Sequence, residues 1–188
     1  MLPFIKQEDN GYKIQAVNGL KDLENSKKDD ELWKSFIRKN LLKSILINLI
    51  FNTFYPYFNI KNPDAVALFS GDYCFARFIL PMAFLLPFMM TFDMLKKSIS
   101  IASLGETGFV PPANFSKYKY IFKSASINGA ITLAVILFLM LLLEFYIPES
   151  YYFDGRLLSV FMGISAAMLS VVFTLGPIRM VRKMNKQI

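Results

Sequence analysis

The chain has 188 residues, of which 54% are hydrophobic and 19% charged, and its formal net charge is +7. Soluble domains average about 45–50% apolar and about 25% charged residues, so both fractions favour a membrane protein. With no histidine and a single cysteine, the sequence excludes a Cys/His zinc site, an intrachain disulfide and a triad with a histidine base. We therefore expect no enzymatic activity, no metal and no cofactor.

The first segment, residues 1–30, is polar and mixed in charge, and it lacks the apolar core of a signal peptide. We expect it to be a loosely ordered cytosolic tail. Asp29, Asp30 and Glu31 then predict a helix start, because the helix dipole favours negative charge at its N-terminus. Residues 31–97 are predicted to form an interfacial helix followed by a first transmembrane hairpin.

Four apolar segments have about the length needed to cross a bilayer. They are Leu41–Phe58, Tyr73–Leu95, Ser124–Ile147 and Leu157–Ile178. The first is the least apolar, since it contains Lys43, two asparagines and a proline. The predicted fold is an all-α integral membrane four-helix bundle of two tandem hairpins. Residues 98–122 form the cytosolic loop between them, and residues 123–188 form the second hairpin with a basic C-terminal tail.

The basic residues predict the orientation. Of the 21 Lys and Arg residues, 18 lie at one end of the predicted spans, and only Lys61, Arg77 and Arg156 lie at the other. By the positive-inside rule, both termini are cytoplasmic. The absence of a signal peptide and the many Lys, Asn, Ile and Phe residues favour a bacterial inner membrane. The net charge then indicates topology and attraction to anionic lipid at the cytosolic face, not a nucleic-acid partner.

The two halves of the chain share a sequence pattern. Residues 39–48 and 119–128 are identical at five of ten positions. A duplicated hairpin that starts and ends in the cytosol would give parallel repeats, related by an axis along the membrane normal. Convergence is the alternative interpretation, because any span that enters from the cytosol tends to begin with basic residues.

The fourth span ends in proline followed by arginine, in the run Gly176–Arg179, and Arg182 and Lys183 follow. This ending resembles small bacterial inner-membrane proteins of uncharacterised function that are built from one two-helix hairpin, here duplicated. The first half departs from it, because Thr91–Lys97 contains no proline. The resemblance implies the hairpin architecture and no known activity.

Polar residues at a spacing of four recur in the first and third spans. They are Ser44, Asn48 and Asn52 in the first, and Ser124, Asn128 and Thr132 in the third. Residues at this spacing share one helix face. In a structural interpretation these two polar stripes bond across helices inside the bundle. In a functional interpretation they line a hydrated path or a site for a polar solute.

The second span contains Pro81 and Pro87, which we interpret as a candidate kink. Each proline lacks an amide hydrogen and leaves a backbone carbonyl, near Arg77 or Ala83, without its helical donor. Broken helices at the membrane midplane hold substrate sites in transporters. A kink that serves only packing is the alternative.

Two candidate ion pairs lie at the ends of the second span. Arg77 can pair with Asp72 at the outer end, or it can bind an anion or a lipid headgroup there. Asp93 precedes Lys97 by four residues at the inner end, which suits a helix-surface ion pair. No charge falls at a predicted midplane.

The fourth span carries small residues at helical spacing, and they are candidates for close helix packing within the chain or in a dimer. These residues are Ser159, Gly163, Ala167 and Ser170.

Two functions remain from the sequence, which favours the first over the second. The first is a transporter or channel subunit for an unidentified small solute, supported by the stripes and the prolines. The second is a non-transporting accessory, regulatory or immunity-type membrane protein that acts through a protein partner. It is supported by the absence of midplane charges and by the long cytosolic segments. Both allow a homo-oligomer or a membrane-protein partner.

Overall fold

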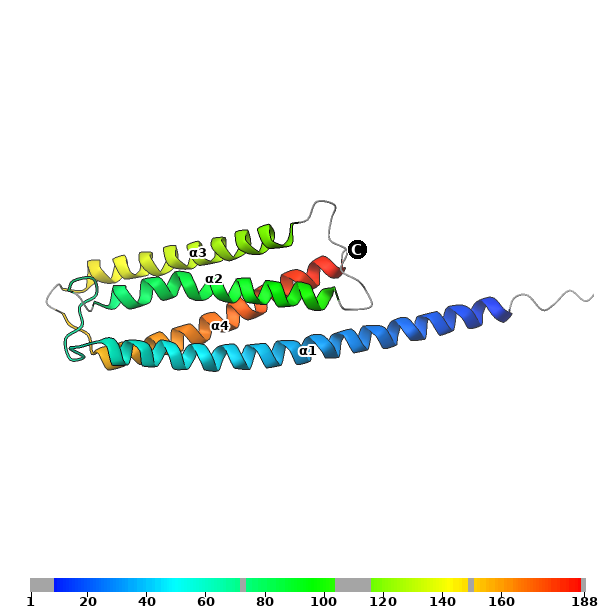
Figure 1. Ribbon diagram of the computed structural model, residues 1–188, viewed down its shortest axis with the longest axis horizontal. Coiled ribbons are helices and arrows are strands. Elements are labelled where there is room, and N and C mark those ends of the chain that lie inside the picture. Colours follow the sequence, from blue (N-terminus) through cyan, green and yellow to red (C-terminus); the bar gives the residue numbers. More distant parts are fainter. Residues whose placement is uncertain (1–8, 72–73, 104–115, 149–150, 187–188) are drawn as a thin grey trace, which may run out of the picture. The chain divides into compact units, whose positions relative to one another are not determined.

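The computed structural model describes residues 9–71, 74–103, 116–148 and 151–186. They form four helices, namely α1 (Asp9–Asn59), α2 (Phe75–Ala102), α3 (Lys117–Tyr146) and α4 (Gly155–Lys186) (Figure 1). Over these described ranges the β pairing is a single isolated bridge between Val66 and Phe153. The prediction of an all-α four-helix bundle is confirmed.

The chain divides into two compact units, residues 1–38 and residues 39–188. Within the first unit α1 is already helical from Asp9, so the expectation of a loosely ordered tail is wrong for residues 9–30. Two properties of this segment explain the helix. It contains no proline, and charged residues at a spacing of four pair along it, with Lys28 Nζ lying 3.1 Å from Glu24 Oε1. Residues 1–8 lie outside the described part.

Three of the described helices are long and apolar enough to cross a membrane. They are α2, α3 and residues Gly155–Met184 of α4. In the most apolar stretch of α3, only 11% of the residues are buried inside the bundle, so its surface suits contact with lipid. These helices fit a protein embedded in a membrane. α1 is not among the three, and its span Leu41–Phe58 stays a prediction.

The helices extend beyond the predicted spans on the side of the 98–122 connection. α2 continues to Ala102, and α3 begins at Lys117. Hydropathy marks only the part of a helix that suits lipid, whereas the backbone continues helical hydrogen bonding into polar residues. The connection between α2 and α3 is therefore shorter than predicted, and residues 104–115 lie outside the described part.

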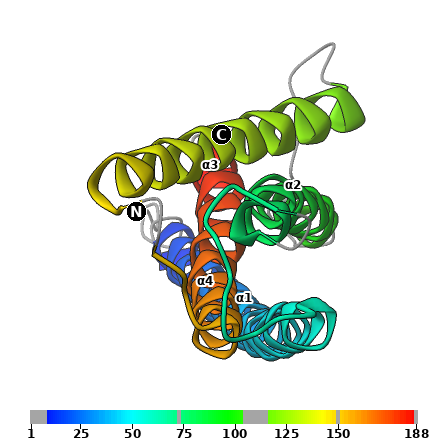
Figure 2. The same ribbon diagram turned by 90° about the vertical axis from the view of Figure 1, so that its left-hand side faces the viewer.

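Within residues 39–188, α2 packs against both α3 and α4 (Figure 2). Two glycines allow close approach of helices. A Cβ atom on Gly129 of α3 would lie 3.0 Å from the carbonyl oxygen of Phe84 on α2. A Cβ atom on Gly163 of α4 would overlap Thr53 Oγ1 of α1 and lie 3.0 Å from the Leu49 carbonyl oxygen. The spatial order is therefore α1, α4, α2, α3.

The two loops opposite the α2–α3 connection are joined to each other. Val66 and Phe153 exchange both backbone hydrogen bonds, at 3.0 and 2.9 Å, and the Gly155 N–H donates to the Pro63 carbonyl at 2.6 Å. We call this contact the loop clasp. Val66 is 1% exposed and belongs to the hydrophobic core, together with Phe75 and neighbouring residues of α2 and α4. Because the clasp joins both loops, the helices alternate in direction.

Candidate functional site: two interhelical cavities

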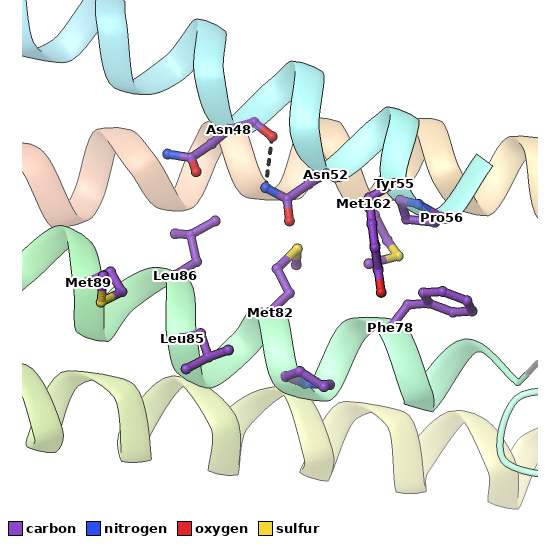
Figure 3. A pocket seen from close by; sticks show the side chains of 11 residues that line it. Asn48, Asn52, Tyr55, Pro56, Phe78, Met82, Leu85, Leu86, Met89 and Met162 are labelled. Atoms are coloured by element: carbon purple, nitrogen blue, oxygen red, sulfur yellow. Dashed lines mark hydrogen bonds between the residues drawn. The ribbon is translucent and has the colours of Figure 1, made fainter. Parts of the chain in front are cut away.

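The first cavity lies between α1, α2 and α4 and has a volume of about 340 Å³ (Figure 3). Most of its lining is apolar. α1 contributes Asn48, Asn52, Tyr55 and Pro56, α4 contributes Met162, and α2 contributes Phe78, Pro81, Met82, Leu85, Leu86 and Met89. The rings of Tyr55 and Phe78 approach edge to face, with centroids 6.2 Å apart. This ring pair bridges α1 and α2 at the end of the cavity nearest the loop clasp.

The amides of the first polar stripe have defined partners. Asn48 Nδ2 donates to Ser170 Oγ of α4 at 2.8 Å and to the Ser44 carbonyl at 3.0 Å, and it lies 3.5 Å from Met90 Sδ of α2. Asn52 Nδ2 donates to the Asn48 carbonyl at 2.9 Å. Figure 3 shows the Asn52 amide directed into the cavity toward α2. Asn48 therefore joins three helices, whereas Asn52 faces the cavity.

The second cavity lies between α2, α3 and α4 and has a volume of about 260 Å³. Its lining contains two residues of the second polar stripe and the proline of α4. The lining residues are Thr91, Leu95, Ser124, Asn128, Val172, Phe173, Gly176, Pro177 and Met180. The two cavities share no lining residue, so each polar stripe contributes to a cavity of its own.

The second stripe also bonds across helices. Asn128 Nδ2 donates to Thr91 Oγ1 of α2 at 3.0 Å, and Thr132 Oγ1 donates to the Asn128 carbonyl at 2.8 Å. Thr91 is 1% exposed, so this hydrogen bond lies inside the bundle. Hydrogen bonds of this kind contribute on average about 0.6 kcal/mol each in membrane helix bundles. The contacts of Asn48 and Asn128 match the structural interpretation of the stripes.

Prolines line both cavities. Pro56 and Pro81 line the first, and Pro177 lines the second, whereas Pro87 is buried. A proline withdraws the amide donor from the carbonyl four residues earlier. Pro81 and Pro87 both lie inside the single helix α2, which continues through the candidate kink to Ala102.

The candidate ion pairs lie at the helix ends. Lys97 Nζ lies 2.5 Å from Asp93 Oδ2, with both side chains about half exposed. Arg77 is exposed near the start of α2, while its predicted partner Asp72 lies outside the described residues. Near the clasp, Arg156 lies 3.9 Å from Asp64, and both side chains are mostly exposed. Of the described residues, no three His, Cys, Asp or Glu side chains gather into a metal site.

The small residues of α4 face its neighbours. Ser159, Gly163 and Ser170 are buried, whereas Ala167 is half-buried beside the fully buried Ala166. The two serine hydroxyls donate to carbonyls one turn earlier, at 2.7 Å each. Ser170 additionally accepts the Asn48 amide. These residues thus pack α4 within the chain.

The sequence did not indicate three partners. Met90 and Thr91 are adjacent residues of α2: the Asn48 amide contacts Met90, and the Asn128 amide donates to Thr91. Val66 pairs with Phe153 in the clasp. Neither residue of α2 belongs to a polar stripe of its own. Only the spatial order of the helices brings them to the asparagines.

Comparisons with protein-family models, curated proteins and solved structures find no match to this chain. The resemblance to two-helix-hairpin proteins therefore stays a prediction.

Proposed function

We propose that the protein acts in the membrane as a non-transporting accessory, regulatory or immunity-type protein that binds a protein partner and has no enzymatic activity. One observation carries this proposal. Asn48 and Asn128 are engaged by neighbouring helices, in two cavities that share no lining residue. A path for a polar solute needs connected polar groups, whereas these amides hydrogen-bond helices together. The polar stripes together with the prolines favour transport when the sequence is considered alone, and this proposal reverses that preference.

The partner is expected to bind the N-terminal unit, residues 1–38. Its described side chains are mostly exposed and charged, among them Lys27, Lys28 and Glu31. A charged, solvent-facing helix suits a protein surface of complementary charge, because such contacts steer association and select partners. The partner is a membrane-associated protein or a second copy of this chain.

A photo-crosslinker at Lys27 tests this expectation in cells that contain the full-length chain. We expect one discrete crosslinked product that a charge reversal at Lys28 weakens. A crosslinker at Phe138, which is exposed on the lipid-suited α3, is the matched control and is expected to give no such product. A smear of many crosslinked products at Lys27, or a single product whose yield the charge reversal at Lys28 does not lower, would count against a partner on this unit.

Transport of a small solute is the second candidate. Its support is the Asn52 amide, which faces the first cavity close to two prolines that line it. If the wild-type protein carries a solute flux in reconstituted vesicles and Asn52→Leu abolishes that flux, transport would be favoured over the accessory function.

The topology we propose places both termini in the cytoplasm of a bacterium, with four spans in the inner membrane. The clasp supports it, because it joins the two loops at one end of an alternating bundle. The 18 basic residues that the sequence assigns to the other side of the predicted spans support the orientation. Cysteines in place of the exposed Asp64 and Asp154, beside the clasp, should react with a membrane-impermeant reagent in intact spheroplasts.

The tandem repeat is also proposed, and the packing supports it. If α1 is exchanged with α3 and α2 with α4, the spatial order α1, α4, α2, α3 becomes α3, α2, α4, α1. This is the same order read from the other end. The two close helix crossings are consistent with this exchange. Leu49 of α1 lies at the crossing with α4, and Gly129 of α3 lies at the crossing with α2. These two residues are 80 positions apart in the sequence. This is the offset that aligns residues 39–48 with residues 119–128. A two-fold axis along the membrane normal would produce this arrangement.

A further inference from the structure

Three residues of α2 at a spacing of four lie along the open side of the first cavity, and a fourth continues their row beyond the lining. Pro81, Leu85 and Met89 line the cavity, and Leu85 and Met89 nevertheless remain 54% and 62% exposed. The cavity therefore opens sideways, toward lipid. Arg77 precedes Pro81 by four residues and lies on the same helix face. It continues the row toward the loop clasp and is the basic residue one helical turn before the cavity lining begins at Pro81.

The length of this row matches one leaflet of a bilayer. At a rise of 1.5 Å per residue, Met89 lies about 18 Å from Arg77 along the helix. Half of the hydrocarbon thickness is about 15 Å. A row that begins at headgroup level beside Arg77 therefore ends near the middle of the membrane.

The volume of the first cavity indicates which kind of molecule can occupy it. A transmembrane helix is about 10–12 Å across, so a segment 18 Å long would need several times the 340 Å³ of this cavity. A single acyl chain is thinner and requires only apolar walls. Met82, Leu86 and Met162 provide such walls on the closed side. The cavity thus fits one lipid chain better than a partner helix.

The charge of Arg77, one turn beyond the lining, indicates which headgroup would bind there. A guanidinium binds phosphate oxygens in a bidentate geometry, and it favours a headgroup with net negative charge over a zwitterionic one. We propose that the first cavity binds one acyl chain of an anionic phospholipid whose phosphate binds Arg77. This site does not depend on whether a protein partner exists.

Photo-crosslinking tests the site in the full chain. The protein is reconstituted in phosphatidylcholine vesicles with a trace of phosphatidylglycerol or phosphatidylcholine that carries the same diazirine acyl chain. Labelling is mapped at Leu85 and Met89, and Phe138 on α3, which is 62% exposed, serves as the reference. We expect phosphatidylglycerol to label the cavity about five-fold more than phosphatidylcholine, which corresponds to about 1 kcal/mol for one basic residue near the surface. At Phe138 the two probes should label equally.

Two arginine variants separate the cavity from general surface charge. Arg77→Gln should bring the probe ratio in the cavity close to one. Arg156→Gln is the matched control, because Arg156 lies near the clasp on α4, beside Asp64, and should leave the ratio unchanged. Equal labelling by both probes in the wild type, or a ratio that Arg77→Gln does not alter, would overturn the proposal. The wild-type comparison decides even where the variant fails to fold.

Discussion

The close crossing of α1 and α4 predicts that Gly163→Ala destabilises the bundle. The added methyl group would overlap Thr53 Oγ1, and it would lie 3.0 Å from the Leu49 carbonyl oxygen and 3.1 Å from Thr53 Cβ. The Thr53 hydroxyl can rotate away, but the backbone carbonyl cannot. α1 and α4 must therefore move apart, which also lengthens the 2.8 Å hydrogen bond from Asn48 to Ser170.

The magnitude follows from a comparison with Gly176→Ala in the same helix. A Cβ atom on Gly176 would have no neighbour within 4 Å outside the adjacent residues, so that variant gains up to about 1 kcal/mol of helix propensity, reduced by the contact of the new methyl group with the Pro177 ring. Gly163→Ala makes the same gain and adds an overpacking cost of about 1–3 kcal/mol. The propensity gain cancels between the two variants, so their difference reports the steric cost at Gly163 minus the cost of a Cβ atom before Pro177.

The free energy of unfolding, measured by titration with a denaturing detergent in mixed micelles, provides the test. We expect Gly163→Ala to unfold about 1–3 kcal/mol more easily than Gly176→Ala. A Gly163→Ala variant more stable than the wild type would refute the close crossing, because the propensity gain alone would then remain and the methyl group would have found open space.

Three further predictions concern contacts of the same bundle. A double-mutant cycle of Asn48→Leu and Ser170→Ala should give a coupling of about 0.6–1.7 kcal/mol in the free energy of unfolding, and additive effects would show that the amide does not bond the hydroxyl. Asp93→Asn should lower stability by no more than about 0.5 kcal/mol in the same titration, because its ion pair is half exposed, and a larger loss would contradict that exposure. In a cysteine-free background, Val66→Cys with Phe153→Cys should form a disulfide under mild oxidation, since hydrogen-bonded antiparallel pairs lie about 5.5 Å apart at Cα. Reduced and oxidised samples with identical gel mobility would argue against the clasp.

The helices that suit a membrane were predictable because their apolar runs have bilayer length. Their boundaries were not, since lipid exposure ends before helical hydrogen bonding does, as at Ala102 and Lys117. The helical conformation of residues 9–30 was missed for a related reason. That segment is polar and mixed in charge overall, so hydropathy does not mark it, and a local ion pair such as Glu24 with Lys28 adds to the stability of its helix.

The candidate site was predictable in part. The spacing of four placed Asn48 and Asn52 on one face, and the structure places both at the first cavity. The neighbours of that face could not be predicted, because periodicity does not say which helix packs against which. Ser170 lies 122 residues from Asn48, and only the order α1, α4, α2, α3 brings them together. The clasp between Val66 and Phe153 depends on the same long-range arrangement.

Solute flux through the reconstituted full chain tests the central claim most directly. Vesicles that contain the wild type, Asn48→Leu or Asn128→Leu are compared with empty vesicles for protons, sodium, potassium and small neutral solutes. Because both asparagines hydrogen-bond helices together, we predict that all three proteins leave every flux at the level of the empty vesicles. Wild-type flux above that level, lost in both variants while they remain folded, would contradict this account.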